Sequence, residues 1–315
     1  MYRSILVPLD GSPWSEQAVP MAATIAQRAH ATVHLVHVHL PQLVNIPSAM
    51  SILDTPTDGQ QREQEQSYLT GVASRLRNDG IEVRTSVRDG ATPAALLAYA
   101  AQHAVDLVVM TMHGRTGLPQ LWFGSVADQL VRSLPTPVLL LHPTADAPTG
   151  LVPHAIRHVL IPLDGSKLSE ECIEHTLGLG ELMEARYTLL HVVEQQPSAG
   201  RSEFYSGALS EQALAAAKHG AASYLDEIAA GLCERTPHMH IAVATGQPSE
   251  MISAYAKQHG VDLIAMSTHG RSGLARWYFG SVTTSMLRTS PTPLLVSKPQ
   301  DWHKQEHPAD RQGEA

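Results

Sequence analysis

Short apolar runs alternate with longer amphipathic stretches along the whole chain. The first run, from Ser4 to Leu9, is apolar at nearly every position, which predicts a strand in a sheet covered on both faces. A turn signal ends this run at Asp10-Gly11-Ser12, and helical periodicity continues from about Trp14 to Ala29. Pro20 lies inside that periodicity, so we expect a kink or a late start there. Ser12 or Ser15 is the expected N-cap.

The rest of the first half continues the alternation of strands and helices. A stretch with three prolines, from Leu40 to Asp58, carries no periodicity. Strands are predicted at Thr32 to Val38, Ile81 to Val87, Asp106 to Met110 and Val138 to Leu141. Helices are predicted at about Gln60 to Asn78, from Pro93 to His103 and from Ser125 to Ser133.

The second half repeats these elements in the same order. The segment from Ser4 to Ser12, SILVPLDGS, returns as HVLIPLDGS from His158 to Ser166. The segment from Gly90 to His103 returns, with its proline one place earlier, from Gly246 to His259. Self-similarity of this kind indicates two copies of one structural unit.

Strands that alternate with helices predict parallel sheets joined by right-handed crossovers. The predicted fold is therefore α/β, with two tandem open twisted parallel sheets, each Rossmann-like with helices on both faces. A ligand in such a sheet binds at the carboxyl ends of the strands. In the first half these ends are Asp10, Val38 and the loop that begins at Thr111.

Composition suggests where the domains end. The segment from Pro143 to Pro153, PTADAPTGLVP, is typical of a linker. We expect one domain over residues 1–143, a linker over 144–155 and a second domain over 156–299. The polar residues 300–315 lack periodicity and are expected to be disordered.

Two glycine loops are the strongest candidate sites. VVMTMHGRTGLPQLWFGSV, from Val108 to Val126, returns as LIAMSTHGRSGLARWYFGSV from Leu263 to Val282. A glycine loop between a strand and a helix offers backbone N–H groups to an anion, and the helix N-terminus adds partial positive charge. Gly114 and Gly117 would allow a close approach, Arg115 would add charge, and Ser125 would cap the helix and donate its hydroxyl. The loop is neither a Walker A loop nor GxGxxG, and an ordinary strand-to-helix turn is the alternative.

Several side chains near these loops also have two interpretations. Asp10 and Asp164 would accept hydrogen bonds from an exocyclic amine or a ribose hydroxyl, or would simply form the turn and cap a helix. His37 and His191 lie in apolar runs, which favours buried imidazoles over ligands. The histidines of the loops would touch the ligand or only fix the loop, and the aromatic residues are expected to pack beneath it. These residues are His113, His269, Trp122, Phe123, Tyr278 and Phe279.

Composition and charge exclude several classes of function. The 315 residues are 43% hydrophobic and 17% charged, with a net charge of −8 and no run rich in Lys and Arg. Nucleic-acid and anionic-membrane binding need such a basic footprint, so neither is expected. The two cysteines, Cys172 and Cys233, form no disulfide framework. Neither a signal peptide nor an apolar run of about 18 residues is visible, so we expect a cytoplasmic protein.

Catalytic and metal-binding patterns are not evident. The chain has 18 histidines, but no Cys/His spacing fits zinc, and metal binding by protein side chains is not expected. No Ser, Cys or Thr recurs with His and Asp as a triad. No catalytic residue is predicted, and an enzyme is the less favoured interpretation.

The residues of the two loops resemble a known motif. Nucleotide-binding members of the universal stress protein family carry Gly-x-x-Gly, nine residues, then Gly-Ser/Thr. The first half has Thr111-Met112-His113-Gly114, nine residues, then Gly124-Ser125, and the second has Ser267-Thr268-His269-Gly270, nine residues, then Gly280-Ser281. Thr111 and Ser267 replace the first glycine of the motif, which bears on ribose contact. The chain resembles two universal stress protein domains in tandem, of the nucleotide-binding branch, with a fold like that of adenine nucleotide alpha hydrolases.

The resemblance implies the ligand and its contacts. ATP, with Mg²⁺ as a companion ion, would meet an aspartate and a valine backbone at its adenine, and the loop at its ribose and phosphates. The implied residues of the first half are Pro8, Asp10, Val38, Met110, Thr111, Gly114, Arg115, Gly117, Gly124, Ser125 and Val126. Those of the second half are Pro162, Asp164, Val192, Met266, Ser267, Gly270, Arg271, Gly273, Gly280, Ser281 and Val282.

The resemblance also implies a role and a mode of pairing. Domains of this family dimerise through their last strands, here Val138 to Leu141 and Leu294 to Ser297, and such pairing within one chain would hide two sheet edges. The sequence does not decide whether whole chains also form a homodimer. The expected role is stress-response regulation, in which ATP binding in one or both domains alters contact with an unknown protein partner. The alternatives are a nucleotide-free interaction protein and a slow ATPase.

Overall fold

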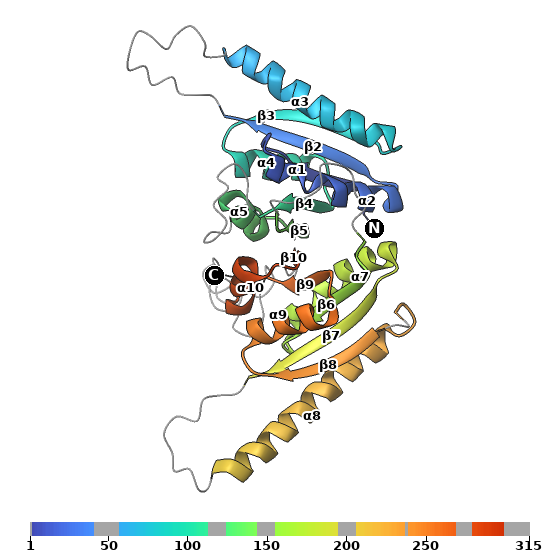
Figure 1. Ribbon diagram of the computed structural model, residues 1–315, viewed down its shortest axis with the longest axis vertical. Helices are drawn as coiled ribbons and strands as arrows, with labels where there is room; N and C mark the ends of the chain where they lie inside the picture. The colour runs from blue at the N-terminus through green and yellow to red at the C-terminus, as the bar shows by residue number, and fades with distance from the viewer. Residues whose placement is uncertain are drawn as a thin grey trace, which may run out of the picture. The chain divides into compact units, whose positions relative to one another are not determined.

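The computed structural model divides the chain into two compact units, Met1–Ala155 and Ile156–Ala315, which Figure 1 shows in ribbon form. It describes residues 2–40, 57–112, 124–143, 155–194, 206–236, 239–268 and 279–298. Within these ranges, each unit contains five parallel strands and the helices between them.

The first unit is a parallel sheet with the strand order β3-β2-β1-β4-β5. All four neighbouring pairs are parallel. Its strands are β1 Ser4–Pro8, β2 Thr32–His39, β3 Val83–Asp89, β4 Leu107–Thr111 and β5 Val138–Leu141. Its helices are α1 Pro13–Glu16, α2 Val19–Ala29, α3 Asp58–Asn78, α4 Thr92–Gln102 and α5 Ser125–Ser133.

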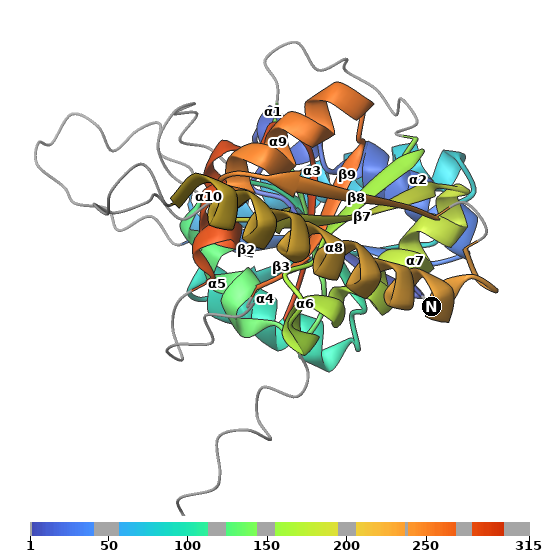
Figure 2. The same ribbon diagram turned by 90° about the horizontal axis from the view of Figure 1, so that it is seen from below.

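The second unit repeats this topology with the order β10-β9-β6-β7-β8, again with every pair parallel. Its strands are β6 His158–Pro162, β7 Arg186–Val193, β8 Met239–Thr245, β9 Leu263–Ser267 and β10 Leu294–Ser297. Its helices are α6 Lys167–Glu170, α7 Cys172–Met183, α8 Ser206–Leu232, α9 Pro248–His259 and α10 Ser281–Thr289. Helix α8 runs along β7 and β8, as both ribbon views show (Figures 1 and 2).

The predicted α/β class with parallel sheets is confirmed, and the differences are local. The first helix is divided: α1 ends at Glu16, and α2 starts at Val19 with Pro20 in its first turn. Pro20 therefore marks a late start, where its missing N–H leaves no bond unmade. The cap of α1 is Ser12, whose side chain accepts from the Ser15 N–H. Strand β3 begins at Val83 and not at Ile81, because the Ile81 N–H donates to the Leu76 carbonyl at the end of α3.

One strand beside the centre of each sheet is buried at every position. All five residues of β4 and all five of β9 are buried, as expected for strands with helices on both faces. In the first unit α2 packs on β1, β2 and β4, while α3 covers β2 and β3 and α4 packs against α5.

Strand β1 is the switch point of its sheet. Its neighbours are β2, which follows it in the chain, on one side and β4 on the other. Strand β6 has the same place between β7 and β9. Crevices open outside the carboxyl ends of strands at such points, because the two crossovers leave in opposite directions.

The amino ends of the central strands are fastened alike in both units. The Asp106 carboxylate accepts hydrogen bonds from the Arg3 N–H at 2.7 Å and the Ser4 N–H at 3.2 Å. The Asp262 carboxylate accepts from the Arg157 N–H at 2.8 Å and the His158 N–H at 3.0 Å.

A buried imidazole and a hydroxyl also meet there in each unit, on exchanged strands. In the first unit Ser4 Oγ on β1 lies 3.2 Å from His34 Nε2 on β2. In the second, His158 Nε2 on β6 lies 2.9 Å from Thr188 Oγ1 on β7. The same two kinds of side chain meet in both units, but the histidine lies on β2 in the first unit and on β6, the counterpart of β1, in the second.

Candidate functional site

A cavity of about 400 Å³ lies at the carboxyl ends of β1, β2 and β4 in the first unit. It is lined by Asp10 after β1, Val38 in β2, Thr111 in β4 and Gly124 before α5. The structure thus brings together the three strand ends singled out from the sequence. The expected residues that line it are Pro8, Asp10, Val38, Met110, Thr111, Gly124, Ser125 and Val126.

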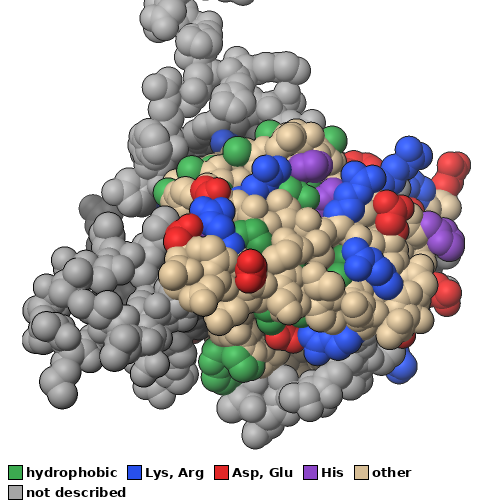
Figure 3. Space-filling view, turned by 90° about the horizontal axis from the view of Figure 1, so that it is seen from above, with side chains coloured by type: hydrophobic (Ala, Val, Ile, Leu, Met, Phe, Trp, Pro, Cys, Tyr) green, Lys and Arg blue, Asp and Glu red, His purple; other side chains and the backbone are tan. Residues whose placement is uncertain are grey.

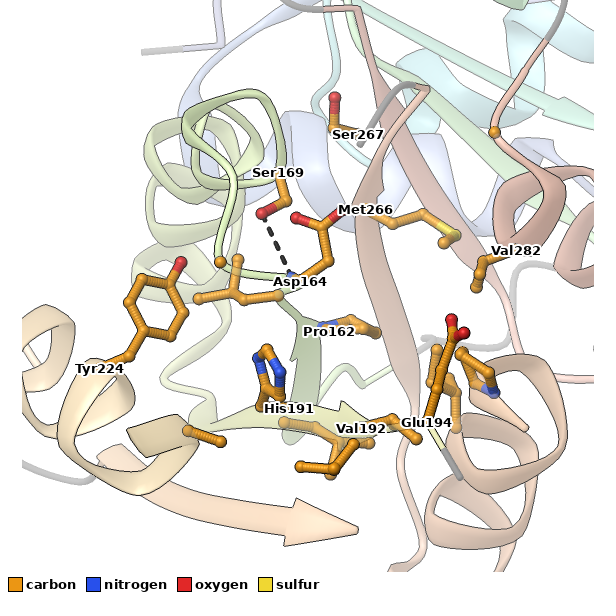
Figure 4. Close-up of a pocket in the computed structure, with 18 of the residues that line it drawn as sticks. Pro162, Asp164, Ser169, His191, Val192, Glu194, Tyr224, Met266, Ser267 and Val282 are labelled. Carbon is orange, nitrogen blue, oxygen red and sulfur yellow. Dashed lines mark hydrogen bonds between the residues drawn. The ribbon is translucent and has the colours of Figure 1, made fainter. Parts of the chain in front are cut away.

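A larger cavity of about 940 Å³ occupies the corresponding place in the second unit. In Figure 4 the side chain of Asp164 and the ring of His191 lie on one side of it, and Met266 and Val282 lie on another. The expected residues that line it are Pro162, Asp164, Val192, Met266, Ser267, Gly280, Ser281 and Val282.

The middle of each glycine loop lies outside the described residues. This applies to six expected ligand contacts and to five other residues discussed above. They are Gly114, Arg115, Gly117, Gly270, Arg271 and Gly273, with His113, His269, Trp122, Phe123 and Tyr278. Phe279, which lies two residues before α10, is 8% exposed and belongs to the core.

The aspartate after the first strand makes the same turn in both units. Asp10 Oδ1 accepts from the Ser12 N–H at 2.9 Å and from Ser12 Oγ at 2.6 Å. Asp164 Oδ1 accepts from the Ser166 N–H at 2.9 Å and from Ser166 Oγ at 2.6 Å. Both carboxylates are half-buried and line their cavities. Each aspartate therefore combines both interpretations: one oxygen shapes the turn, and the side chain borders the cavity.

The glycine inside this turn is required by its backbone conformation. Gly11 has φ 81° and Gly165 has φ 84°, a region that residues with a Cβ seldom adopt. The turn directs Ser15 and Ser169 back toward the strand end, where each hydroxyl accepts from the N–H of the aspartate, at 3.3 Å in the first unit and 3.4 Å in the second. Figure 4 draws the second of these bonds.

Each cavity is closed on one side by a helix N-terminus. Gly124 is the N-cap of α5 and makes no side-chain cap bond, so Ser125 is the first helical residue. The expectation that Ser125 caps the helix was wrong, because the backbone turns one residue earlier. The first bond of the α5 ladder runs from the Asp128 N–H to the Gly124 carbonyl at 2.9 Å. The N–H groups of the first turn before it have no partner within the helix and are available to an anion.

Both ends of the glycine loop are fixed by backbone hydrogen bonds. The Met112 N–H donates to the Leu141 carbonyl at 2.9 Å, and the Gly124 N–H donates to the Met112 carbonyl at 3.1 Å. Thr268 and Gly280 make the corresponding bonds at 2.9 and 3.0 Å. The strand end and the helix start are therefore held side by side, with Thr111 and Ser267 buried beneath the site.

The sequence did not predict that α3 and α8 each form one wall of a cavity. In the first unit this wall includes Gln61 and Glu65 of α3, and in the second Ala217, Ala221 and Tyr224 of α8. The sequence before α3, from Leu40 to Asp58, has no periodicity, so the position of this helix over the strand ends had no local signal. Repeat alignment offered one: Ser67-Tyr68-Leu69 returns as Ser223-Tyr224-Leu225.

The two strand histidines are buried as expected, and they also line the cavities. His37 is 3% and His191 8% exposed. The His191 ring meets the Tyr224 ring edge-on at 6.1 Å, and the Tyr224 hydroxyl donates to Glu170 Oε1 at 3.1 Å. Burial, followed by the negative charge of Glu170, raises the pKa of Tyr224, so its hydroxyl stays protonated as a donor.

Carboxylates and imidazoles form a cluster in the wall of the first cavity. Glu65 Oε2 lies 2.9 Å from His39 Nδ1, and Glu65 Oε1 lies 3.4 Å from His37 Nε2. The other nitrogen of His39 lies 2.8 Å from Asp58 Oδ1. Burial opposes the charged form of His39, but the hydrogen bonds to Asp58 and Glu65 outweigh it, and the pKa of His39 is raised.

Other kinds of site find little support in the described parts of the chain. Within them no group of three or more His, Cys, Asp or Glu side chains is placed to hold a metal ion. No helix there is long and apolar enough to cross a bilayer. On the face of the first unit in Figure 3, Lys and Arg side chains are interspersed with Asp and Glu. Arg62 pairs with Asp89, and Arg75 pairs with Glu16.

Comparison with known proteins agrees with this architecture. The model of the universal stress protein family matches the chain twice, over residues 1–142 and 155–298. A universal stress protein of Mycolicibacterium smegmatis is 27% identical over 304 residues, covering 94% of this chain and 97% of that protein. Universal stress protein Rv2005c of Mycobacterium tuberculosis is 26% identical over 301 residues, with the same coverage of 94% and 97%.

A solved structure shares the fold over almost the full length. It is a putative universal stress protein from Pseudomonas aeruginosa, with a TM-score of 0.67, 19% identity and coverage of 96% of both chains. The two matches of the family model span most of the sequence and fall on the two sheets. The chain therefore belongs to the universal stress protein family and carries two of its domains in tandem.

Proposed function

We propose that each domain binds one molecule of ATP and that the protein regulates a stress response through a partner that senses this occupancy. One observation carries the proposal: in both units a carboxylate, a strand end and a helix N-terminus converge on one cavity. These groups suit a base, a ribose and a phosphate in turn.

The proposed pose follows the chemistry of the lining. The base lies over the end of β2, where Val38 offers backbone groups and Asp10 a carboxylate. The phosphates lie at the N-terminus of α5, where N–H groups without a partner inside the helix and the helix dipole favour negative charge. The ribose lies between them, near Thr111. Asp164, Val192, Ser267 and α10 take the same parts in the second unit.

Mg²⁺ would enter with the phosphates. Magnesium is commonly held by phosphate oxygens and water, with few protein ligands, so the proposal needs no metal-ligand cluster in the chain. We also propose a cytoplasmic location. The pairing of the last strands, and a dimer of whole chains, stay predictions.

The first experiment identifies what the purified protein carries. The chain is purified without added nucleotide and denatured, and the released small molecules are identified by mass spectrometry, with calorimetric titration of the emptied protein by ATP and Mg²⁺. Two adenine nucleotides per chain are expected. Neither released nucleotide nor a calorimetric signal would favour the interaction-protein alternative. ADP that accumulates over time would favour the slow ATPase.

The substitution Asp10→Asn tests the base contact without removing the turn. The amide oxygen of asparagine replaces Oδ1 as the acceptor for Ser12, while an NH₂ donor replaces the other carboxylate oxygen. We expect ATP affinity to fall by about tenfold or more in the first domain only, since a donor would face the exocyclic amine. Titration calorimetry should then resolve one tight and one weak site.

Asp79→Asn is the matched control, because Asp79 is exposed at the end of α3 and outside the cavity lining. Two unchanged sites in Asp10→Asn would contradict the proposed base contact.

A further inference from the structure

The two cavities differ in the wall that α3 forms in the first unit and α8 forms in the second. Alignment on the shared Ser-Tyr-Leu segment pairs Gln61 of α3 with Ala217 of α8, and Glu65 with Ala221. All four residues line their cavities. Between them, Gln64 pairs with Gly220, which also lines the second cavity. Every polar side chain of this wall in the first unit is therefore cut back to a methyl group or less in the second.

The two cavities also differ in volume. The first measures about 400 Å³ and the second about 940 Å³. A Cβ added at Gly220 would have no atom within 4 Å, so the space beside α8 is open. Both linings share an aspartate, a histidine, a valine and a helix N-terminus. Beyond the strand end, Leu40 of the first lining corresponds to Glu194 of the second.

We propose that the second domain accepts adenine nucleotides that carry an additional ring-sized group on the base, and that the first domain excludes them. The inference rests on the proposed function for the place of the base. Helix α8 packs on β7 and β8, and the base is proposed to lie over the end of β7. The added room therefore adjoins the base and not the phosphates at α10.

The narrow wall of the first domain is held in place. Glu65 is fixed from two sides, by His39 at 2.9 Å and by His37 at 3.4 Å. The His39 side chain is fully buried and holds Asp58 at 2.8 Å through its other nitrogen. Glu65 cannot swing away from the cavity without breaking contacts to buried imidazoles, which desolvation makes expensive.

The second domain has neither member of the His39–Glu65 pair. Val193 stands in the place of His39 at the end of the strand, and Ala221 stands in the place of Glu65. Both members of the pair thus differ between the units. The α8 wall consists of Ala217, Gly220, Ala221 and Tyr224, whose small side chains and aromatic ring suit an apolar group on the base.

Titration with substituted nucleotides tests the inference. The probes are ATP, N6-benzyl-ATP and 2-phenylethylthio-ATP, which extend the base from two different edges. We expect ATP to bind at two sites per chain and at least one of the substituted probes to bind at one. The excluded site should bind that probe at least about tenfold more weakly than ATP, as a misfitting group in a closed pocket does.

Exchange of the wall residues assigns the site. Ala217→Gln with Ala221→Glu should weaken binding of the substituted probe at the second domain at least about tenfold more than it weakens binding of ATP there. Gln61→Ala with Glu65→Ala should add a second site for the probe. Gln66→Ala and Ser223→Gln are matched controls at exposed positions of the same helices and should change nothing.

The outcomes separate this inference from the proposed function. Two ATP sites with substituted probes that bind at both domains, or at neither, would overturn the inference and leave ATP binding intact. No ATP binding at either domain would overturn the proposed function itself. A probe that binds only at the first domain would also overturn the inference.

Discussion

At the scale of single residues, burial decides which groups respond to pH. His34 is 3% exposed and lies 2.9 Å from the Tyr99 hydroxyl through Nδ1. Burial and, to a smaller degree, repulsion from His103 and Arg84 lower the pKa of His34 to about 4. Its ring is therefore neutral in the folded protein throughout the physiological range.

The low pKa of His34 predicts a sign for the effect of acid. The folded state binds this proton less readily than the unfolded state, whose pKa is near 6.5. The contribution of His34 to the free energy of unfolding is therefore fully present above about pH 6.5 and is lost as the pH falls through about 4. NMR titration of the histidine ring carbons, with His34→Gln to assign the signal, should give a midpoint near 4. A midpoint near 6.5 would contradict the buried environment.

A pair of equivalent glycines predicts unequal responses to the same substitution. A Cβ at Gly124 would lie 2.6 Å from the Met112 carbonyl oxygen, whereas at Gly280 the nearest atom, the Thr268 carbonyl oxygen, would be 3.8 Å away. Gly124→Ala should destabilise the protein by about 1–3 kcal/mol, because the backbone must shift. Gly280→Ala, its matched control, should stay within about 0.5 kcal/mol. Chemical denaturation measures both, and equal losses would contradict this packing.

At the scale of elements, periodicity predicted strands and helices well because each has one consistent environment. The buried strands read as apolar runs, and Pro93 and Ser125 marked helix starts that the structure places within one residue. The position of α3 over the strand ends was not predictable. It depends on contacts such as His39 with Glu65, which lie 26 positions apart in the sequence.

The bond between β2 and α3 predicts a pH-dependent contribution to stability. The pKa of His39 is raised in the folded protein. Its contribution to the free energy of unfolding is therefore fully present below about pH 6.5 and is lost as the pH rises through the folded pKa. The difference in unfolding free energy between the native chain and His39→Gln should therefore be largest in mild acid and shrink toward alkaline pH. Denaturation series across pH 5 to about 9 measure it. A difference that grows with pH would show that His39 is not held in its charged form.

At the scale of the whole molecule, the parallel topology made the place of the cavities predictable. It pointed to the carboxyl ends of the strands at the switch point. All sixteen expected ligand contacts within the described ranges, which the family resemblance implied, border one of the two cavities. The difference between the cavities was not foreseen. It includes Gln61 and Glu65, which correspond to two alanines in the second unit. The sequence alone does not distinguish these positions from exposed helix positions.

The exchanged histidine and hydroxyl at the amino ends of the strands bear on how the halves have parted. Ser4 faces His34 in one unit, and His158 faces Thr188 in the other. Recombination that joined β1 of one half to β2 of the other would set two hydroxyls, or two imidazoles, against each other in a dry interior. The halves thus share one plan, but their first two strands are matched only within the same half, so β1 and β6 cannot be exchanged without losing the imidazole–hydroxyl pair in both units.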